Sequence, residues 1–112
     1  MSQGNSLQGY LQILSDINRL KIIQFIAYDE KTVSEIVNQT KLSQPLVSHH
    51  LKVLKNYTIL DTKRNGPFIL YKLHNTDLLD ILGLLCELIS KDNELEDPMF
   101  IPSQKRKDKK DV

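Results

Sequence analysis

The sequence predicts a mainly α-helical fold that carries one small β-hairpin. Apolar residues recur at three- and four-residue spacing before Tyr57 and again after Thr76, which is the periodicity of amphipathic helices. Between these segments, Asn65-Gly66 separates two runs of strand-forming residues, a strong hairpin signal. Because a two-stranded hairpin is only marginally stable alone, we expect it to pack on the helices.

The first two predicted helices each follow a residue that can cap a helix N-terminus. Asn5 or Ser6 precedes a helix that extends to about Leu14, and Asp16 precedes one that extends to about Tyr28. The polar residues 29–31 then end the second helix.

The next two predicted helices form a helix-turn-helix. Thr32 or Ser34 begins a short third helix, residues 40–42 form a tight turn, and Ser43 caps a fourth helix that extends to Tyr57. Pro45 lies in the first turn of the fourth helix, where a missing backbone donor costs little.

The period changes from helical to extended after residue 58. Residues 59–63 and 68–74 are the predicted strands, and Asn75 or Thr76 caps a last helix that extends to about Ser90. We therefore predict one winged helix-turn-helix domain over residues 1–92, with dimerising terminal helices, and a disordered charged tail over residues 93–112.

The net charge of +1 conceals a division along the chain. Residues 41–74 contain six basic residues and one acidic residue, whereas residues 75–102 contain one basic and seven acidic residues. We expect a polyanion to dock on the central basic segment, although a solvated surface has the same composition.

The lack of a recognisable targeting signal and the single cysteine lead us to expect a cytoplasmic protein. The N-terminus lacks the basic and apolar segments of a secretory signal, and the longest apolar run, residues 78–89, is too short to span a membrane. Cys86 is the single cysteine, so neither an internal disulfide nor a multi-cysteine zinc site can form.

The helix-turn-helix and the hairpin together predict a DNA-binding surface, because an α-helix fits the major groove and an adjacent hairpin can reach the backbone or minor groove. Val47, Leu51 and Leu54 must face the core, which turns the polar residues of the fourth helix outward. The predicted DNA-contacting residues are Ser43, Gln44, Pro45, Ser48, His49, Lys52, Lys63, Arg64 and Asn65.

Three segments resemble the ArsR/SmtB family of winged-helix transcriptional regulators. LSDINRLKII (14–23) is similar to the family's opening motif, with Ile17 in place of the usual proline. LSQPLVSHHLKVLK (42–55) is similar to its recognition-helix motif, and KRNGPFILYKL (63–73) resembles its wing. The resemblance implies a repressor that binds a near-palindromic operator as a homodimer.

The resemblance also implies a dimer that is joined mainly by the first and last helices. In this sequence, the apolar faces of these two helices are larger than one small domain can cover. The predicted interface residues are Leu7, Tyr10, Leu11, Leu14, Leu78, Ile81, Leu82, Leu85, Leu88 and Ile89.

The usual metal sites of the family are absent from this sequence. Thr32 and Ser34 stand where many members have a Cys-x-Cys pair, and no histidine follows His74 to form the site on the last helix. The sequence therefore predicts no metal and no cofactor, and it does not name an inducer.

Other functions have less support. A winged-helix module that binds protein is the main alternative, double-stranded RNA is disfavoured because its deep groove excludes a helix, and no residue set suggests an enzyme.

We expect His50 to be a half-buried structural residue, His74 to pack between wing and helix, and Cys86 to be inert. Leu46 is expected either to touch a thymine methyl or to pack on the third helix.

Overall fold

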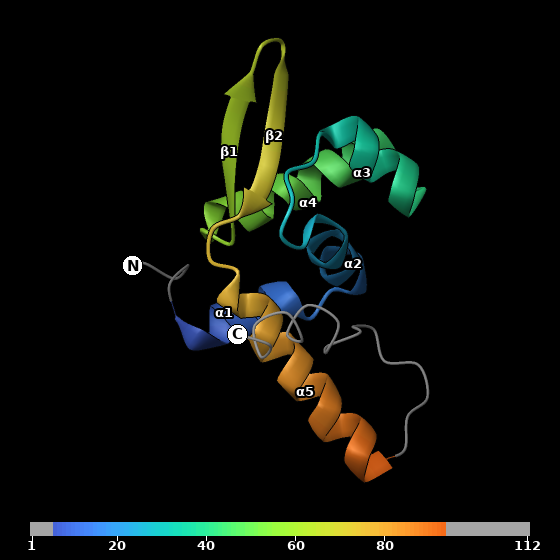
Figure 1. Ribbon diagram of the computed structural model, residues 1–112, viewed down its shortest axis with the longest axis vertical. Helices are drawn as coiled ribbons and strands as arrows, with labels where there is room; N and C mark the ends of the chain where they lie inside the picture. Colours follow the sequence, from blue (N-terminus) through green and yellow to red (C-terminus); the bar gives the residue numbers. More distant parts are fainter. Residues whose placement is uncertain (1–5, 94–112) are drawn as a thin grey trace, which may run out of the picture. The chain divides into compact units, whose positions relative to one another are not determined.

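The computed structural model describes residues 6–93, with side chains described to residue 90 (Figure 1). The elements are α1 (Leu7–Leu14), α2 (Ile17–Ile26), α3 (Val33–Thr40), α4 (Gln44–Asn56), β1 (Leu60–Asn65), β2 (Phe68–Leu73) and α5 (Asp77–Asn93). The chain divides after His74 into two compact units, the first of which contains α1 to β2 and the second α5. The predicted mainly α-helical fold with one hairpin is confirmed.

The predicted caps define the starts of the first two helices. Ser6 Oγ accepts a hydrogen bond from the Gly9 amide at 2.9 Å, and Asp16 Oδ1 accepts one from the Asn18 amide at 2.8 Å. Each cap of this kind contributes about 1 kcal/mol. Helix α2 ends at Ile26 rather than near Tyr28, because Ala27 turns the backbone to a positive φ of 46°.

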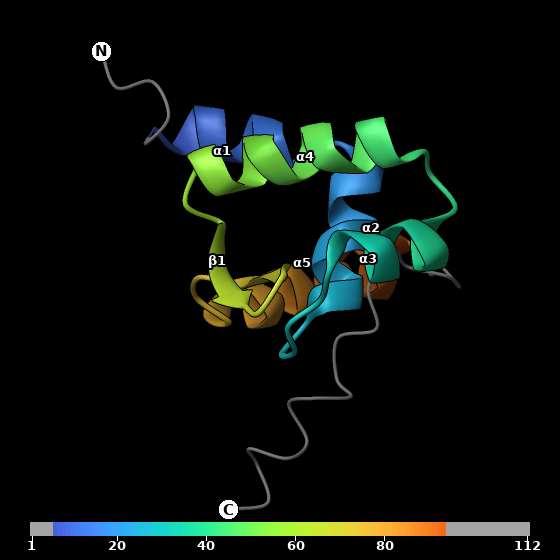
Figure 2. The same cartoon turned by 90° about the horizontal axis from the view of Figure 1, so that it is seen from above.

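The core of the first unit lies between its helices and the base of the hairpin. In Figure 2, α4 is seen along its length, and a short connection joins its N-terminal end to α3. The buried apolar residues from α2 onward in this unit are Ile22, Ile23, Ile26, Ile36, Val47, Leu51, Leu54, Ile59, Leu60 and Leu73. Burying one such side chain stabilises the fold by about 1.5 to 3 kcal/mol.

The hairpin is antiparallel, with a register that runs from Leu60 opposite Leu73 to Asn65 opposite Phe68. Gly66 makes the turn with a φ of 64°, a conformation that costs glycine little. One further rung extends the edge of β2: the Lys31 amide donates to the Tyr71 carbonyl at 3.0 Å, and the Tyr71 amide donates to the Lys31 carbonyl at 2.8 Å. The hairpin is therefore fixed to the segment that precedes α3.

Helix α5 makes up the described part of the second unit. Asn75 Oδ1 accepts a hydrogen bond from the Asp77 amide at 2.9 Å at its start, and the helix extends three residues beyond the predicted end at Ser90. Residues 94–112 of the predicted tail lie outside the described residues. Among the helices that are described, none is long and apolar enough to cross a bilayer.

Candidate DNA interface

The first turn of α4 is built by local sequence. Ser43 has an extended backbone, with a ψ of 155°, and its Oγ accepts a hydrogen bond from the Leu46 amide at 3.3 Å. Pro45 occupies the first turn, where its fixed φ favours helix initiation. Ser43, Gln44 and Pro45 are all exposed, so the N-terminus of the helix faces solvent.

The two faces of α4 differ as the sequence predicts. Val47, Leu51 and Leu54 are at most 1% exposed and hold the helix on the core. The predicted outward residues Gln44, Ser48, His49 and Lys52 are all exposed. Their orientation is confirmed, and their contacts with DNA remain a prediction.

Leu46 also lies on the exposed part of the first turn. Its side chain is 37% exposed, so it is not buried against α3. Of the two roles expected for this residue, the exposure favours an apolar contact with a partner such as a thymine methyl.

His50 is buried, with only 4% of its surface exposed. Its Nδ1 lies 3.2 Å from Arg19 Nη1 of α2, although the sequence gives no sign that the two residues meet. Burial lowers the pKa of His50; the carboxylate of Asp16 opposes this shift, and the cations Arg19 and His49 add to it. The expected structural role is therefore correct, but the burial is deeper than predicted.

The hairpin brings the three predicted wing residues to its tip. Lys63, Arg64 and Asn65 are the last residues of β1, and all three are exposed. Among the described residues, Arg64 has no hydrogen-bond or ion-pair partner, so its guanidinium is available to a ligand.

Lys63 is already paired within the chain. Its Nζ lies 3.2 Å from Glu30 Oε2, and both side chains are partly exposed. Sequence reasoning missed this contact because 33 residues separate the partners. An exposed pair of this kind contributes about 1 kcal/mol or less, so a phosphate can compete for the lysine.

Two basic residues that were not predicted to contact DNA, Lys55 and Lys72, lie beside the wing. An open groove of about 610 Å³ is lined by Lys55, Lys63 and Lys72, together with Asp61 and neighbouring residues of α4 and the hairpin. The groove extends the positive surface from the wing toward the C-terminal end of α4.

The interpretation of His74 as a packing residue is wrong. Its side chain is 52% exposed, and Nδ1 lies 3.0 Å from Asp61 Oδ2. The strand register explains this contact, because Asp61 pairs with Lys72 and His74 lies two residues further along, directly after the end of β2. The single acidic residue of the basic segment is thus in contact with an imidazole.

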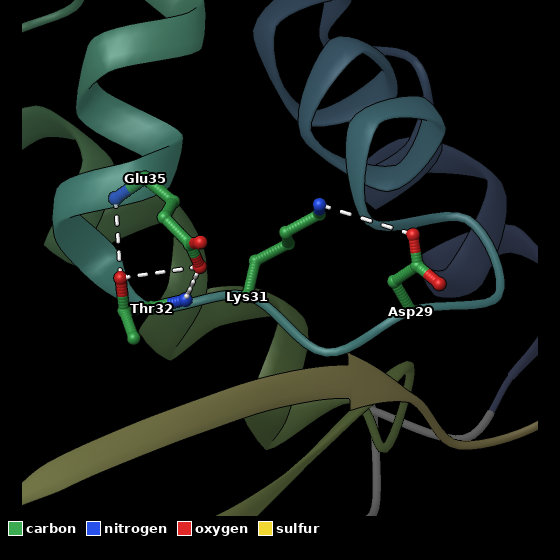
Figure 3. Close-up of polar contacts among 4 residues, drawn as sticks. All are labelled: Asp29, Lys31, Thr32 and Glu35. Atoms are coloured by element: carbon green, nitrogen blue, oxygen red, sulfur yellow. Dashed lines mark hydrogen bonds and ion pairs between the residues drawn. The ribbon is translucent and has the colours of Figure 1, made fainter.

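The start of α3 shows what occupies a family metal position here (Figure 3). Thr32 Oγ1 accepts the Glu35 amide at 3.2 Å, and Glu35 Oε1 accepts the Thr32 amide at 2.8 Å, which together form a capping box. Lys31 Nζ lies 3.8 Å from Asp29 Oδ2 just before it. Within residues 6–90, no three His, Cys, Asp or Glu side chains are grouped to hold a metal ion.

The residues predicted for a dimer interface fall into two groups. Leu14, Leu78 and Leu82 are buried in the single chain, and Tyr10 is partly buried, which raises the pKa of its hydroxyl. The others are 43–73% exposed: Leu7, Leu11, Ile81, Leu85, Leu88 and Ile89. Leu84, 50% exposed, was missed, although it lies on the same helix.

Comparison with solved structures supports the fold. The homodimeric winged helix-turn-helix DNA-binding domain Mb0332 of Mycobacterium bovis matches 76% of this chain, and the match covers 77% of that structure, with a TM-score of 0.64 and 24% identity. The likeness shows a winged helix-turn-helix.

Sequence comparison identifies the family. The profile described as "Bacterial regulatory protein, arsR family" matches residues 16–61. The transcriptional repressor SdpR of Bacillus subtilis is 32% identical over 90 residues, which span 80% of this chain and 100% of SdpR. The chain belongs to the ArsR family. The cadmium resistance transcriptional regulatory protein CadC of Listeria innocua is 36% identical over 80 residues, which span 70% of this chain and 67% of CadC.

Membership in the ArsR family gives the interface its general role. SdpR and the proteins described by the family profile are transcriptional regulators rather than enzymes, and the fold is that of a DNA-binding domain. The chain is thus a DNA-binding transcriptional regulator.

Proposed function

We propose that this protein is a cytoplasmic repressor that binds a near-palindromic operator in double-stranded DNA as a homodimer. The observation that carries the proposal is α4, whose inner face is buried while its outer face presents polar and basic side chains to solvent. Repression is supported by SdpR, a repressor whose whole length this chain covers. A protein-binding module would favour an apolar or acidic outer face, which α4 lacks.

The residues of α4 divide between base reading and backbone contact. Gln44, Ser48 and His49 have side chains that can reach base edges in the major groove, and we assign them to base reading. Ser43 and Lys52 are assigned to phosphates, the former at the positive helix N-terminus. Pro45 is exposed beside them in the first turn, and we assign it to the same contact surface.

The wing supplies a second contact. Arg64 and Asn65 lie at the tip of β1, and Lys63 lies one residue further from the turn. We assign all three to phosphate or the adjacent minor groove, with Arg64 as the main cation because Lys63 is shared with Glu30.

The proposed dimer uses the exposed apolar residues of α1 and α5. An apolar set of this size on a small chain usually marks an interface. Mb0332, which has the same fold, is described as homodimeric. Leu14, Leu78 and Leu82 are already buried in the single chain, so they would add little new buried area to the interface. Two-fold symmetry would place two α4 helices about 34 to 36 Å apart, one turn of DNA.

The cadmium response in the name of CadC is not transferred to this chain. Thr32 is engaged in the capping box of α3, and a hydroxyl is a poor ligand for soft metals that prefer thiolates. We propose that regulation here, whatever its signal, does not use the two usual metal sites.

Replacing Gln44 with alanine tests base reading. The operator is first obtained by selection from random DNA, and the variant is expected to lose about 1 to 3 kcal/mol of discrimination at one position. Binding to a library with each position varied measures this loss. Gln39→Ala, at an exposed glutamine of α3, should leave base preference unchanged. Weaker binding of the Gln44 variant to all sequences alike would assign Gln44 to the backbone.

Replacing Arg64 with alanine tests the wing. Loss of one phosphate contact should make the slope of log affinity against log salt shallower by about one unit. Titrations over a range of salt concentrations measure the slope. Arg64→Lys keeps the charge and should keep the slope, and an unchanged slope in the alanine variant would show that Arg64 does not contact phosphate.

A further inference from the structure

Arg19 and His50 form the polar contact between α2 and α4. Arg19 Nη1 lies 3.2 Å from His50 Nδ1, and Arg19 Nε donates to the Ile13 carbonyl at 2.8 Å. A guanidinium has only donors, so Nδ1 must be the acceptor in this contact. The His50 ring is therefore neutral, with its proton on Nε2.

The surroundings of the ring oppose a second proton. His50 is 4% exposed, and among the described residues its Nε2 has no hydrogen-bond partner. The titratable and charged groups that act on the ring are Asp16 and Arg19, from the start of α2, and the neighbouring His49. A protonated ring would lose the Arg19 bond and would place two cations 3.2 Å apart in a partly buried site.

We propose that Arg19 and His50 are a positioning pair that holds the recognition helix α4 on α2 only while the His50 imidazole is neutral, so that acid weakens operator binding. The proposal rests on the proposed function, because the base-reading residues Gln44, Ser48 and His49 lie on the helix that the pair holds. His50 itself is 4% exposed, so its side chain is not part of the exposed face of α4.

The direction of the pH effect follows from the lowered pKa of His50. Above the ordinary imidazole pKa of about 6.5, the ring is neutral in both the folded and the unfolded chain. As the pH falls below this value, the unfolded chain takes up the proton first, and the stability that the neutral ring contributes is progressively lost.

The test therefore compares the wild type with His50→Asn. Asparagine Oδ1 can accept from Arg19 near the position of Nδ1, and it does not titrate. Operator affinity and the free energy of unfolding without DNA are measured from about pH 7.5 to about pH 5.5, across the ordinary imidazole pKa. Relative to the variant, the wild type should lose affinity by up to about a hundredfold per pH unit, the limit for two linked protons, one in each subunit of the proposed dimer. Gln39→Ala, at an exposed residue of α3 outside this contact, should follow the wild type.

Two further measurements keep the test decisive. Nitrogen NMR of the free protein should show the His50 proton on Nε2, and Arg19→Gln, which keeps a donor without the charge, should reduce the loss of stability in acid. A proton on Nδ1, or equal pH profiles for the wild type and His50→Asn, would overturn the proposal. If no operator were bound at any pH, the proposed function would fail, while the unfolding and NMR data would still decide whether the pair acts as described.

Discussion

Replacing Leu85 with glutamate is expected to convert the protein to monomers and to lower operator affinity by about a hundredfold or more, because the second half-site would no longer be bound in the same complex. Leu85 is 46% exposed on α5, between Ile81 and Leu88, which are more exposed still. At a two-fold interface the change would place two unpaired carboxylates in an apolar contact, at a cost of several kcal/mol. Sedimentation equilibrium and operator titration measure the two effects.

Glu87→Gln is the matched control for Leu85→Glu. Glu87 is exposed on α5 and lies about 200° around the helix from Leu85, so it should not meet the partner. This variant should remain dimeric and bind the operator like the wild type. A wild-type protein that is monomeric at micromolar concentration, with operator binding intact, would refute the dimer.

Replacing Leu51 with alanine is expected to reduce the free energy of unfolding by about 2 to 5 kcal/mol. Leu51 is 1% exposed on the inner face of α4, and the truncated side chain would leave a cavity beneath the recognition helix. Domains of this size have about 5 to 15 kcal/mol of total stability, so the variant would approach unfolding. Urea denaturation at one fixed protein concentration measures the change.

Leu46→Ala makes the same substitution at an exposed position of the same helix. Leu46 is 37% exposed, so we expect this variant to lose about 1 kcal/mol or less. Equal losses for the two variants would mean that α4 is not seated by its inner face.

The local features of the fold could be predicted because each depends on a few neighbouring residues. Ser6, Asp16, Thr32 and Ser43 cap their helices, and Gly66 supplies the positive φ of the hairpin turn. The outward orientation of the α4 residues followed from the spacing of their apolar neighbours.

The errors and omissions concern the backbone at one helix end and contacts between distant residues. The early end of α2 could not be predicted, since the positive φ falls on Ala27, a residue type that rarely adopts it. The pairs Glu30–Lys63 and Asp61–His74 depend on how the hairpin is placed and registered, which periodicity does not specify. Arg19 and His50, which lie on α2 and α4, are 31 residues apart in the sequence, so periodicity does not predict their contact either.

The rung between Lys31 and Tyr71 has a mechanical consequence for the wing. Because both backbone hydrogen bonds of this rung are made, the wing is tied at mid-strand to the residue that leads into α3 and cannot tilt as a separate flap. A residue inserted or deleted between α2 and α3 would therefore shift β2 through this rung. It would displace the tip of the wing without changing any residue of the DNA interface. The length of the connection between α2 and α3 therefore helps to set the position of the wing on the DNA-binding surface.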